Sequence, residues 1–356
     1  MIWCYPLVND DNIEVDLRSD TKTLPTKEMI EAISNAKLGD DQAREDPTVI
    51  ELEEKSAKLF RKEEGLLVTS GTQGNLLSIL SQTDGRGSEI IVEKDAHCVF
   101  YEVGNLAALG GIMVRTLTGK NGYIDPDDVK NTIRSDFSHY PKTALVSLEN
   151  THNRAGGCAF TVDQMDSMGK LAQEYDIGFH VDGARIFNAA FATNSSVQEL
   201  TKTATSVTFC LSKGLSCPIG SIIVGSSELI SRARKLRQML GGSMRQAGII
   251  AAPGLVALNN FSRIKDDNEN AKLLADGIKS YGSNAIKVSD PDSNIVLAQT
   301  AISSDDFIQK LADKNILVYG MGPNTTRFVT HRLVNKEDIE LSIERIGEML
   351  KEMITF

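Results

Sequence analysis

Residues 178–185 read Gly-Phe-His-Val-Asp-Gly-Ala-Arg, and residues 206–214 read Ser-Val-Thr-Phe-Cys-Leu-Ser-Lys-Gly. Each stretch begins with a short, mostly apolar run and ends in charged or polar residues beside a glycine. Apolar runs of this length are typical of strands that are buried on both faces of a parallel sheet. Similar runs, rich in β-branched residues, are residues 89–92, 112–117, 144–148 and 221–224. This pattern predicts a sheet whose strands are mostly parallel.

Helical segments lie between these runs. Residues 48–62 place their apolar side chains on one helical face, and Asp46-Pro47 supplies a cap and a first-turn proline. Residues 163–175 and 228–240 have the same character. Alternation of strands and helices over residues 65–225 predicts an α/β domain of three layers.

The chain changes character after a long helical section at residues 246–281. Short apolar runs and two helical segments then alternate without the regular strand–helix order, which is typical of an α+β domain. We therefore predict an N-terminal segment of residues 1–20, a large domain of residues 21–265 and a smaller C-terminal α+β domain of residues 266–356.

Composition excludes several classes of function. The 356 residues carry 38 Lys and Arg against 48 Asp and Glu, a net charge of -10, which disfavours binding to nucleic acid or to an anionic membrane. No apolar stretch is long enough to span a bilayer, and residues 1–12 lack the pattern of a signal peptide. The five cysteines are irregularly spaced, so we expect no disulfide framework, no metal site and a cytoplasmic location.

Lys213 follows the predicted strand at residues 207–210 and lies between a serine and a glycine. Burial lowers the pKa of an amine, and a neutral amine can attack a carbonyl carbon. Lys213 is therefore a candidate for a lysine that forms a Schiff base. An ordinary surface lysine at the end of a strand would have the same local sequence, so both interpretations stay open.

Asp182 and Arg185 follow the predicted strand at residues 178–181. Open α/β sheets bind ligands at the carboxyl ends of their strands. An aspartate there can hold a protonated pyridine nitrogen, and an arginine can bind a phenolate or carboxylate oxygen. The alternative is a structural Asp–Arg pair at a turn.

Residues 70–75 read Ser-Gly-Thr-Gln-Gly-Asn and connect a short apolar run to a helical one. Small residues at the start of a helix leave backbone N–H groups open to an anion, which the helix dipole also favours. The segment is a candidate phosphate site, although a plain helix cap has a similar sequence. His97 and His152 also follow predicted strands, so they are candidates for proton transfer at the same sheet edge.

Taken together, these segments resemble those of the low-specificity threonine aldolases, which are fold-type-I pyridoxal-phosphate enzymes of the β-eliminating lyase group. The matching stretches are residues 15–21, 39–41, 45–49, 70–72, 74–76, 95–97, 101–102, 148–153, 156–157, 180–189, 210–215, 218–221, 241–242, 244–248 and 327–331. The resemblance implies a large domain like that of aspartate aminotransferase, with pyridoxal 5'-phosphate as cofactor. It also implies a homotetramer built as a dimer of dimers.

The resemblance implies a role for each matching residue. Lys213 would bind the cofactor covalently, Asp182 would pair with its pyridinium nitrogen, and His97 would stack on its ring. Arg185 would contact a cofactor oxygen and the substrate carboxylate, and His152 would lie near the substrate β-hydroxyl. The phosphate would be held by Ser70, Gly71, Thr72 and Arg245. The substrate carboxylate would also be bound by Ser19 and Arg327.

The implied reaction is aldol cleavage of L-threonine or L-allo-threonine to glycine and an aldehyde. The chain departs from the family pattern at Ala43 and Arg44, where a tyrosine and a glycine are usual, and at Ser243, where a glycine is usual. These departures keep open another pyridoxal-phosphate lyase or racemase, acting by β-elimination or on a bulkier 3-hydroxy amino acid. A catalytically silent binding protein is the alternative from a different class.

Overall fold

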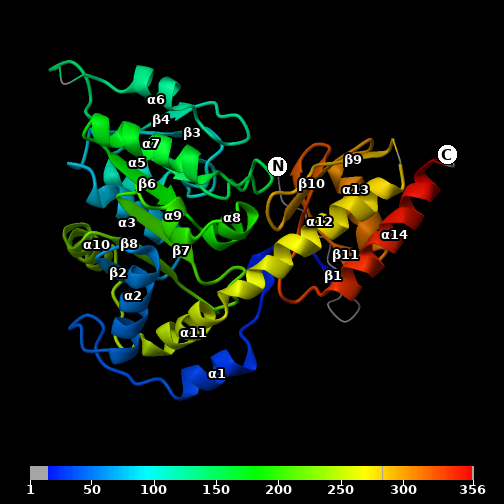
Figure 1. Cartoon of the computed structure of the whole chain (residues 1–356), viewed down its shortest axis with the longest axis horizontal. Helices are drawn as coiled ribbons and strands as arrows, with labels where there is room; N and C mark the ends of the chain where they lie inside the picture. The colour runs from blue at the N-terminus through cyan, green and yellow to red at the C-terminus, as the bar shows by residue number, and fades with distance from the viewer. Residues whose placement is uncertain (1–14, 136, 283, 355–356) are drawn as a thin grey trace. The chain divides into compact units, whose positions relative to one another are not determined.

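The computed structural model describes residues 15–135, 137–282 and 284–354. The described chain divides by its packing into two compact units, which Figure 1 shows. The larger unit contains residues 24–261, and the smaller contains residues 262–354 together with residues 15–23. The predicted boundaries at residues 20 and 265 stay a proposal. The expected absence of a signal peptide concerns residues 1–12, which lie outside the described residues.

In the described part of the larger unit, seven strands form one sheet in the order β2-β8-β7-β6-β5-β3-β4. They are β2 (Glu64–Val68), β3 (Glu89–Glu93), β4 (Met113–Leu117), β5 (Thr143–Glu149), β6 (Gly178–Asp182), β7 (Ser206–Cys210) and β8 (Ser221–Gly225). Strand β8 runs antiparallel to both of its neighbours, β2 and β7, and the other adjacent pairs are parallel. The prediction of a mostly parallel sheet is confirmed.

The larger unit also contains helices, most of which cover the two faces of this sheet (Figure 1). They are α1 (Lys27–Ser34), α2 (Pro47–Phe60), α3 (Gly71–Ser81), α4 (His97–Phe100), α5 (Asn105–Gly110), α6 (Pro126–Thr132), α7 (Val162–Glu174), α8 (Ile186–Ala192), α9 (Val197–Leu200), α10 (Ser227–Met239) and α11 (Gly248–Asn259). On one face α3 and α10 bury an apolar cluster against β2 and β8. On the other, Phe60 of α2 stacks on Phe209 of β7 with ring centroids 4.9 Å apart. The larger unit therefore has the predicted three layers.

The start of α2 illustrates how the sequence determines a helix boundary. The Asp46 carboxylate accepts hydrogen bonds from the backbone N–H groups of Thr48 and Val49. Pro47 occupies the first helical position, where its missing N–H group would have had no helical partner.

The described part of the smaller unit has α+β structure, as predicted. Its antiparallel sheet has the strand order β12-β13-β10-β9, and a second, two-stranded sheet pairs β1 in parallel with β11. These elements are β1 (Val15–Asp16), β9 (Ile286–Val288), β10 (Ile295–Thr300), β11 (Ile316–Leu317), β12 (Tyr319–Gly322) and β13 (Thr325–Val329), with helices α12 (Ile264–Ser280), α13 (Ser304–Ala312) and α14 (Lys336–Ile354). The apolar faces of these helices enclose one buried core with the strands.

The long helical section predicted at residues 246–281 is interrupted in the structure. Helix α11 ends at Asn259, a short 3-10 turn follows at Phe261–Arg263, and α12 begins at Ile264. The interruption coincides with the boundary between the two units. Within the described ranges, no helix has the length and apolar character needed to cross a bilayer.

Candidate active site

The carboxyl ends of the parallel strands bring the predicted polar residues to one edge of the large sheet. Asp182 is the last residue of β6, and its neighbours in register are Glu149 of β5 and Thr208 of β7. Lys213 follows the end of β7 by three residues and is half-buried. Because β6 and β7 are adjacent, the structure places Asp182 and Lys213 at the same edge, as the sequence predicts.

The N-terminus of α3 presents backbone donors at the end of β2. Ser70 caps the helix by accepting a hydrogen bond from the N–H group of Gln73 at 3.1 Å. The N–H groups of Gly71 and Thr72 donate no hydrogen bond to any residue that the structure describes. A Cβ atom on Gly71 would lie 2.8 Å from Cys210 Sγ, so glycine lets the helix start pack closely on β7. This helix end suits a phosphate group.

The Asp182 carboxylate is buried and held by two donors. Its Oδ1 accepts a hydrogen bond from the Ala184 N–H group at 3.1 Å, and its Oδ2 accepts one from Asn75 Nδ2 at 2.8 Å. The same Asn75 amide donates to Glu102 Oε1 at 2.8 Å. Asn75 therefore joins two buried carboxylates through one NH2 group, which fixes the direction in which Asp182 faces.

His180 fixes the orientation of Asn75 in turn. Burial lowers the pKa of His180 to about 4, so its ring is neutral near pH 7. His180 Nε2 lies 3.2 Å from Asn75 Oδ1, and Nδ1 lies 2.8 Å from Ser206 Oγ, which also accepts a hydrogen bond from Gln82. One arrangement satisfies every group: Ser206 donates to Nδ1, and Nε2–H donates to Asn75 Oδ1. The Asn75 NH2 group then faces the carboxylates.

Replacing Asn75 by aspartate is expected to lower the free energy of unfolding by about 3–5 kcal/mol. The new carboxylate would lie beside the buried carboxylates of Glu102 and Asp182, and the NH2 group that now donates to both would be gone. Urea unfolding followed by circular dichroism measures the loss. Asn131→Asp, at an exposed position of α6, is the control and is expected to change little. Adding Glu102→Gln to Asn75→Asp should restore part of the lost stability, and an unchanged unfolding midpoint in Asn75→Asp would contradict the assignment.

His97 begins α4 and is anchored by two carboxylates. Its backbone N–H group donates to Glu149 Oε2 at 2.7 Å, and its Nδ1 lies 2.9 Å from Glu102 Oε1. Burial lowers the pKa of His97, but the hydrogen bond with Glu102 and the charge of Asp182 outweigh it, so the net pKa lies above the usual value. The structure thus connects His97 to Asp182 through Glu102 and Asn75.

Replacing Glu102 by glutamine is expected to lower the pKa of His97, since a neutral amide no longer favours the imidazolium. A raised pKa in the folded state contributes stability that is complete below the unfolded pKa of about 6.5 and is lost as the pH rises through the folded value. The variant should therefore lose more stability relative to wild type at pH 5.5 than at pH 9, by about 1.4 kcal/mol for each pKa unit removed. NMR titration of the His97 ring and urea unfolding at both pH values test this. Glu51→Gln, at an exposed site of α2, is the control.

His152 lies at the same sheet edge with both ring nitrogens engaged. Its Nε2 lies 3.2 Å from Glu93 Oε2, and its Nδ1 accepts a hydrogen bond from the Ala155 N–H group at 3.2 Å. The ring is 1% exposed, and a Cβ atom on Gly122 would overlap it. The structure therefore holds this imidazole in a fixed orientation, and its role near the substrate hydroxyl stays a prediction.

The remaining predicted residues fall in two places. Arg185 is buried at the start of α8, and Arg245 is largely exposed and donates to Asp40 at 2.9 Å. Ser19 and Arg327 belong to the smaller unit, where Arg327 Nη2 donates to the backbone carbonyl of Arg18 at 3.3 Å. Ser19 and Arg327 are both buried.

Three possible metal ligands also meet in this network. One ligand atom each from His97, Glu102 and Asp182 lies within 4.8 Å of the others. The amide hydrogens of Asn75 already face both carboxylates, so the group is satisfied as a hydrogen-bonded cluster. The expectation of no metal site stays a prediction.

Sequence reasoning missed the residues that orient this site: Asn75, Glu93, Glu102, Glu149 and His180. Each lies within or next to a motif that the sequence analysis singled out. Asn75 directly precedes the apolar run that begins at Leu76 of α3, and the structure leaves it 1% exposed. Buried polar side chains need partners, so such a position predicts a hydrogen-bonded cluster.

Comparisons with known proteins identify the family. Residues 16–302 match the model of the beta-eliminating lyase family. A protein named probable low-specificity L-threonine aldolase 2 from Arabidopsis thaliana is 38% identical over 92% of this chain and 94% of its own length. A low specificity L-threonine aldolase from Escherichia coli K12 is 38% identical over 91% of this chain and 96% of its own.

A solved structure agrees with these sequence matches at the level of the fold. It is described as a Leishmania major threonine aldolase and has a TM-score of 0.82 at 17% identity, covering 95% of this chain and 100% of that one. The matching family model, the two aldolase relatives and the shared fold agree. The chain therefore belongs to the beta-eliminating lyase family and, within it, to the low-specificity L-threonine aldolases.

Proposed function

We propose that this chain catalyses pyridoxal-phosphate-dependent aldol cleavage of L-threonine and L-allo-threonine to glycine and an aldehyde. The observation that carries the proposal is the buried Asp182 carboxylate, fixed by Asn75 and the Ala184 N–H group, beside the strand that leads to Lys213. The names of the relatives from Arabidopsis thaliana and Escherichia coli support the same reaction.

The donor groups at the sheet edge fit the cofactor. The N–H groups of Gly71 and Thr72 have no partner among the described residues and suit a phosphate, with Ser70 and Arg245 as proposed neighbours. A fixed, buried carboxylate at Asp182 suits a protonated pyridine nitrogen. A half-buried amine at Lys213 suits an aldehyde carbon. When bound, the cofactor supplies an electron sink for the bond that breaks at the substrate Cα.

The side chains of this chain would perform the remaining tasks. Asp182 would pair with the protonated pyridine nitrogen, because Asn75 and the Ala184 N–H group hold its carboxylate in a fixed direction. His97 would hold the ring, and Arg185 would bind an oxygen of the cofactor. Binding of the substrate carboxylate by Arg185, Ser19 and Arg327 remains part of the proposal.

The proton of the substrate β-hydroxyl would be removed by His152 or by a water molecule that it orients. Both ring nitrogens of His152 hold hydrogen bonds in this structure, so either role would require the Ala155 N–H group to release Nδ1, which would then accept the proton. Glu93 would then keep the ring proton on Nε2.

The test is an assay of aldehyde release. Purified protein supplied with pyridoxal 5'-phosphate should release acetaldehyde from L-threonine or L-allo-threonine. Ala43 and Arg44 replace the usual tyrosine and glycine and are both exposed, which keeps open β-elimination, racemisation or a bulkier 3-hydroxy amino acid. A panel of 3-hydroxy amino acids set against serine and cysteine separates these reactions, and absence of aldehyde from every substrate would exclude the aldolase.

We also propose that the protein is cytoplasmic and assembles as a homotetramer, a dimer of dimers. The irregular cysteines and the family resemblance support these proposals. Light scattering of the holoenzyme measures the assembly size directly.

A further inference from the structure

A cavity in the larger unit has an unbalanced positive charge. It lies between α10 and the loop before α2 and has a volume of about 460 Å³. Its lining is Gln42, Arg44, Ser231, Arg234, Lys235, Arg237, Gln238 and Ser243. Among the described residues that line it, four are cations, four are neutral polar residues and none is acidic or apolar. The chain as a whole has a net charge of -10, so the charge of the cavity lining is opposite in sign to the net charge of the chain.

Two of the four cations are paired with buried carboxylates. Arg237 Nη2 lies 2.7 Å from Asp41 Oδ2, and Arg234 Nη2 lies 2.9 Å from Glu53 Oε2. Glu53 and Arg237 also satisfy the edge strand β2, because Leu67 N–H donates to Glu53 and Leu67 C=O accepts from Arg237. These pairs fix Arg234 and Arg237 beside the edge strand β2.

The other two cations, Arg44 and Lys235, are not neutralised. Neither side chain has an ion pair or hydrogen bond with any residue that the structure describes, and both are exposed. In addition, Arg237 is 1% exposed, and its Nε is buried without a hydrogen-bond partner in the described structure. A buried guanidinium N–H that lacks an acceptor indicates a missing ligand or water.

The backbone of Arg44 is strained. Its φ is 60°, in the left-handed region that arginine rarely adopts and that glycine adopts freely. Strained residues persist where function or surrounding structure requires them, so an observed outlier is a reason to look for a function. Arginine at position 44 therefore adopts an unfavourable backbone conformation. Its guanidinium group adds a fourth positive charge to the cavity lining.

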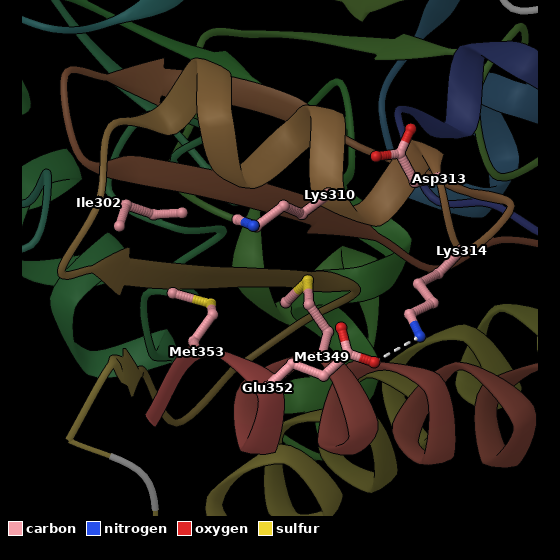
Figure 2. A pocket seen from close by; sticks show the side chains of 7 residues that line it. All are labelled: Ile302, Lys310, Asp313, Lys314, Met349, Glu352 and Met353. Atoms are coloured by element: carbon pink, nitrogen blue, oxygen red, sulfur yellow. Dashed lines mark hydrogen bonds and ion pairs between the residues drawn. The ribbon is translucent and has the colours of Figure 1, made fainter. Parts of the chain in front are cut away.

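A second cavity provides a contrast. Figure 2 shows a cavity of about 360 Å³ in the smaller unit, lined by Ile302, Lys310, Asp313, Lys314, Met349, Glu352 and Met353. There the two lysines are accompanied by two acids, and Lys314 donates to Glu352 at 3.1 Å, the dashed line in the figure. Its two positive charges are matched by two negative charges, so this second cavity does not indicate an anion-binding site.

We propose that the cavity lined by Arg44, Arg234, Lys235 and Arg237 is a binding site for a compact polyanion of the phosphate class, such as pyrophosphate or a small phosphate ester. Arginine forks and a lysine bind phosphate oxygens well, and the neutral side chains supply further donors. Each described residue that lines the cavity ends in a charged or polar group. The lining includes none of the residues assigned to the reaction centre, and the proposal does not depend on the proposed function.

The site adjoins the proposed phosphate loop of the reaction centre. Ser243 follows Gly242, which packs so closely on Gln73 that a Cβ atom there would overlap the amide. Gln73 in turn accepts hydrogen bonds from the N–H and hydroxyl groups of Thr69, next to Ser70. An anion bound beside Ser243 would therefore stiffen the loop at residues 69–73.

Calorimetric titration of pyrophosphate into the holoenzyme, in phosphate-free buffer of low ionic strength, tests the proposal. Saturating the protein with pyridoxal 5'-phosphate beforehand keeps the cofactor site occupied. We expect saturable binding in wild type, and binding weaker by about tenfold or more in Arg44→Gly and in Lys235→Ala. The matched control is Arg61→Gly, since Arg61 is an exposed arginine with a φ of 51° that does not line the cavity.

Comparing Arg44→Gly with Arg61→Gly separates the relief of backbone strain from the loss of anion binding. Both remove a left-handed arginine, so both should raise the temperature of thermal unfolding, but only Arg44→Gly should lose pyrophosphate. Failure of wild type to bind, or equal binding by all variants, would overturn the site. Equal binding of citrate would overturn the phosphate assignment. Wild type that does not bind, with an assembly that dissociates in Arg44→Gly by light scattering, would show that a second copy covers the cavity instead.

Discussion

Replacing Lys213 by alanine is expected to lower aldehyde release from L-threonine by at least about a thousandfold, because the variant lacks the amine that would bind the cofactor covalently. Lys213 is the lysine that follows β7, beside the strand that carries Asp182. Protein mixed with pyridoxal 5'-phosphate should also lose the absorbance band near the visible edge that wild type gains. The spectrum reports the covalent link even where residual activity is too low to measure.

Lys202→Ala is the matched control for this experiment. Lys202 precedes β7 in the same unit, and its side chain is exposed. It should leave both the spectrum and the rate unchanged. Retention of the band and of aldehyde release by Lys213→Ala would remove the basis of the proposed reaction.

Replacing Asp182 by asparagine is expected to reduce kcat by about a hundredfold or more, since a neutral amide cannot stabilise a proton on the pyridine nitrogen. The structure also predicts a loss of stability. Asp182 accepts hydrogen bonds on two oxygens, from Ala184 N–H and from Asn75, whereas asparagine has one carbonyl oxygen. One buried donor would be left without an acceptor, which should lower the free energy of unfolding by about 1–3 kcal/mol.

These two effects can be measured separately. Steady-state kinetics at saturating cofactor reports the change in kcat, and urea unfolding reports the change in stability. Asp163→Asn, at an exposed position in the first turn of α7, is the control for the loss of one carboxylate. An Asp182→Asn variant that keeps wild-type kcat with saturating cofactor would contradict the role assigned to this residue.

Much of the larger unit follows from local patterns. The apolar runs at residues 89–92, 144–148 and 178–181 became β3, β5 and β6, because buried parallel strands need near-continuous apolar sequence. The meeting of Asp182 and Lys213 at one edge also follows, since parallel strands end together. Strands β1, β9 and β12 were not predicted, because their two to four residues give too little pattern to recognise.

The hydrogen-bonded network that orients Asp182 could not be predicted from the sequence in the same way. Asn75 and Glu102 are 27 residues apart in the chain, and Asn75 and Asp182 are 107 apart, so nothing local relates them. His180 was visible as a histidine inside an apolar strand, but only the structure shows that it directs the amide of Asn75. The fixed ring of His152 likewise depends on Gly122, which comes from a distant turn.

The pairing of β1 with β11 has a consequence for the order of folding during synthesis. Residues 24–261 are continuous, so the larger unit can complete its sheet while the ribosome is still translating the rest. Val15 and Asp16 leave the exit tunnel early but find their partners, Ile316 and Leu317, only near the end of translation. Until then this leading strand has no partner, and a ribosome that stalls before residue 316 would leave it exposed to chaperones and to pairing with other nascent chains.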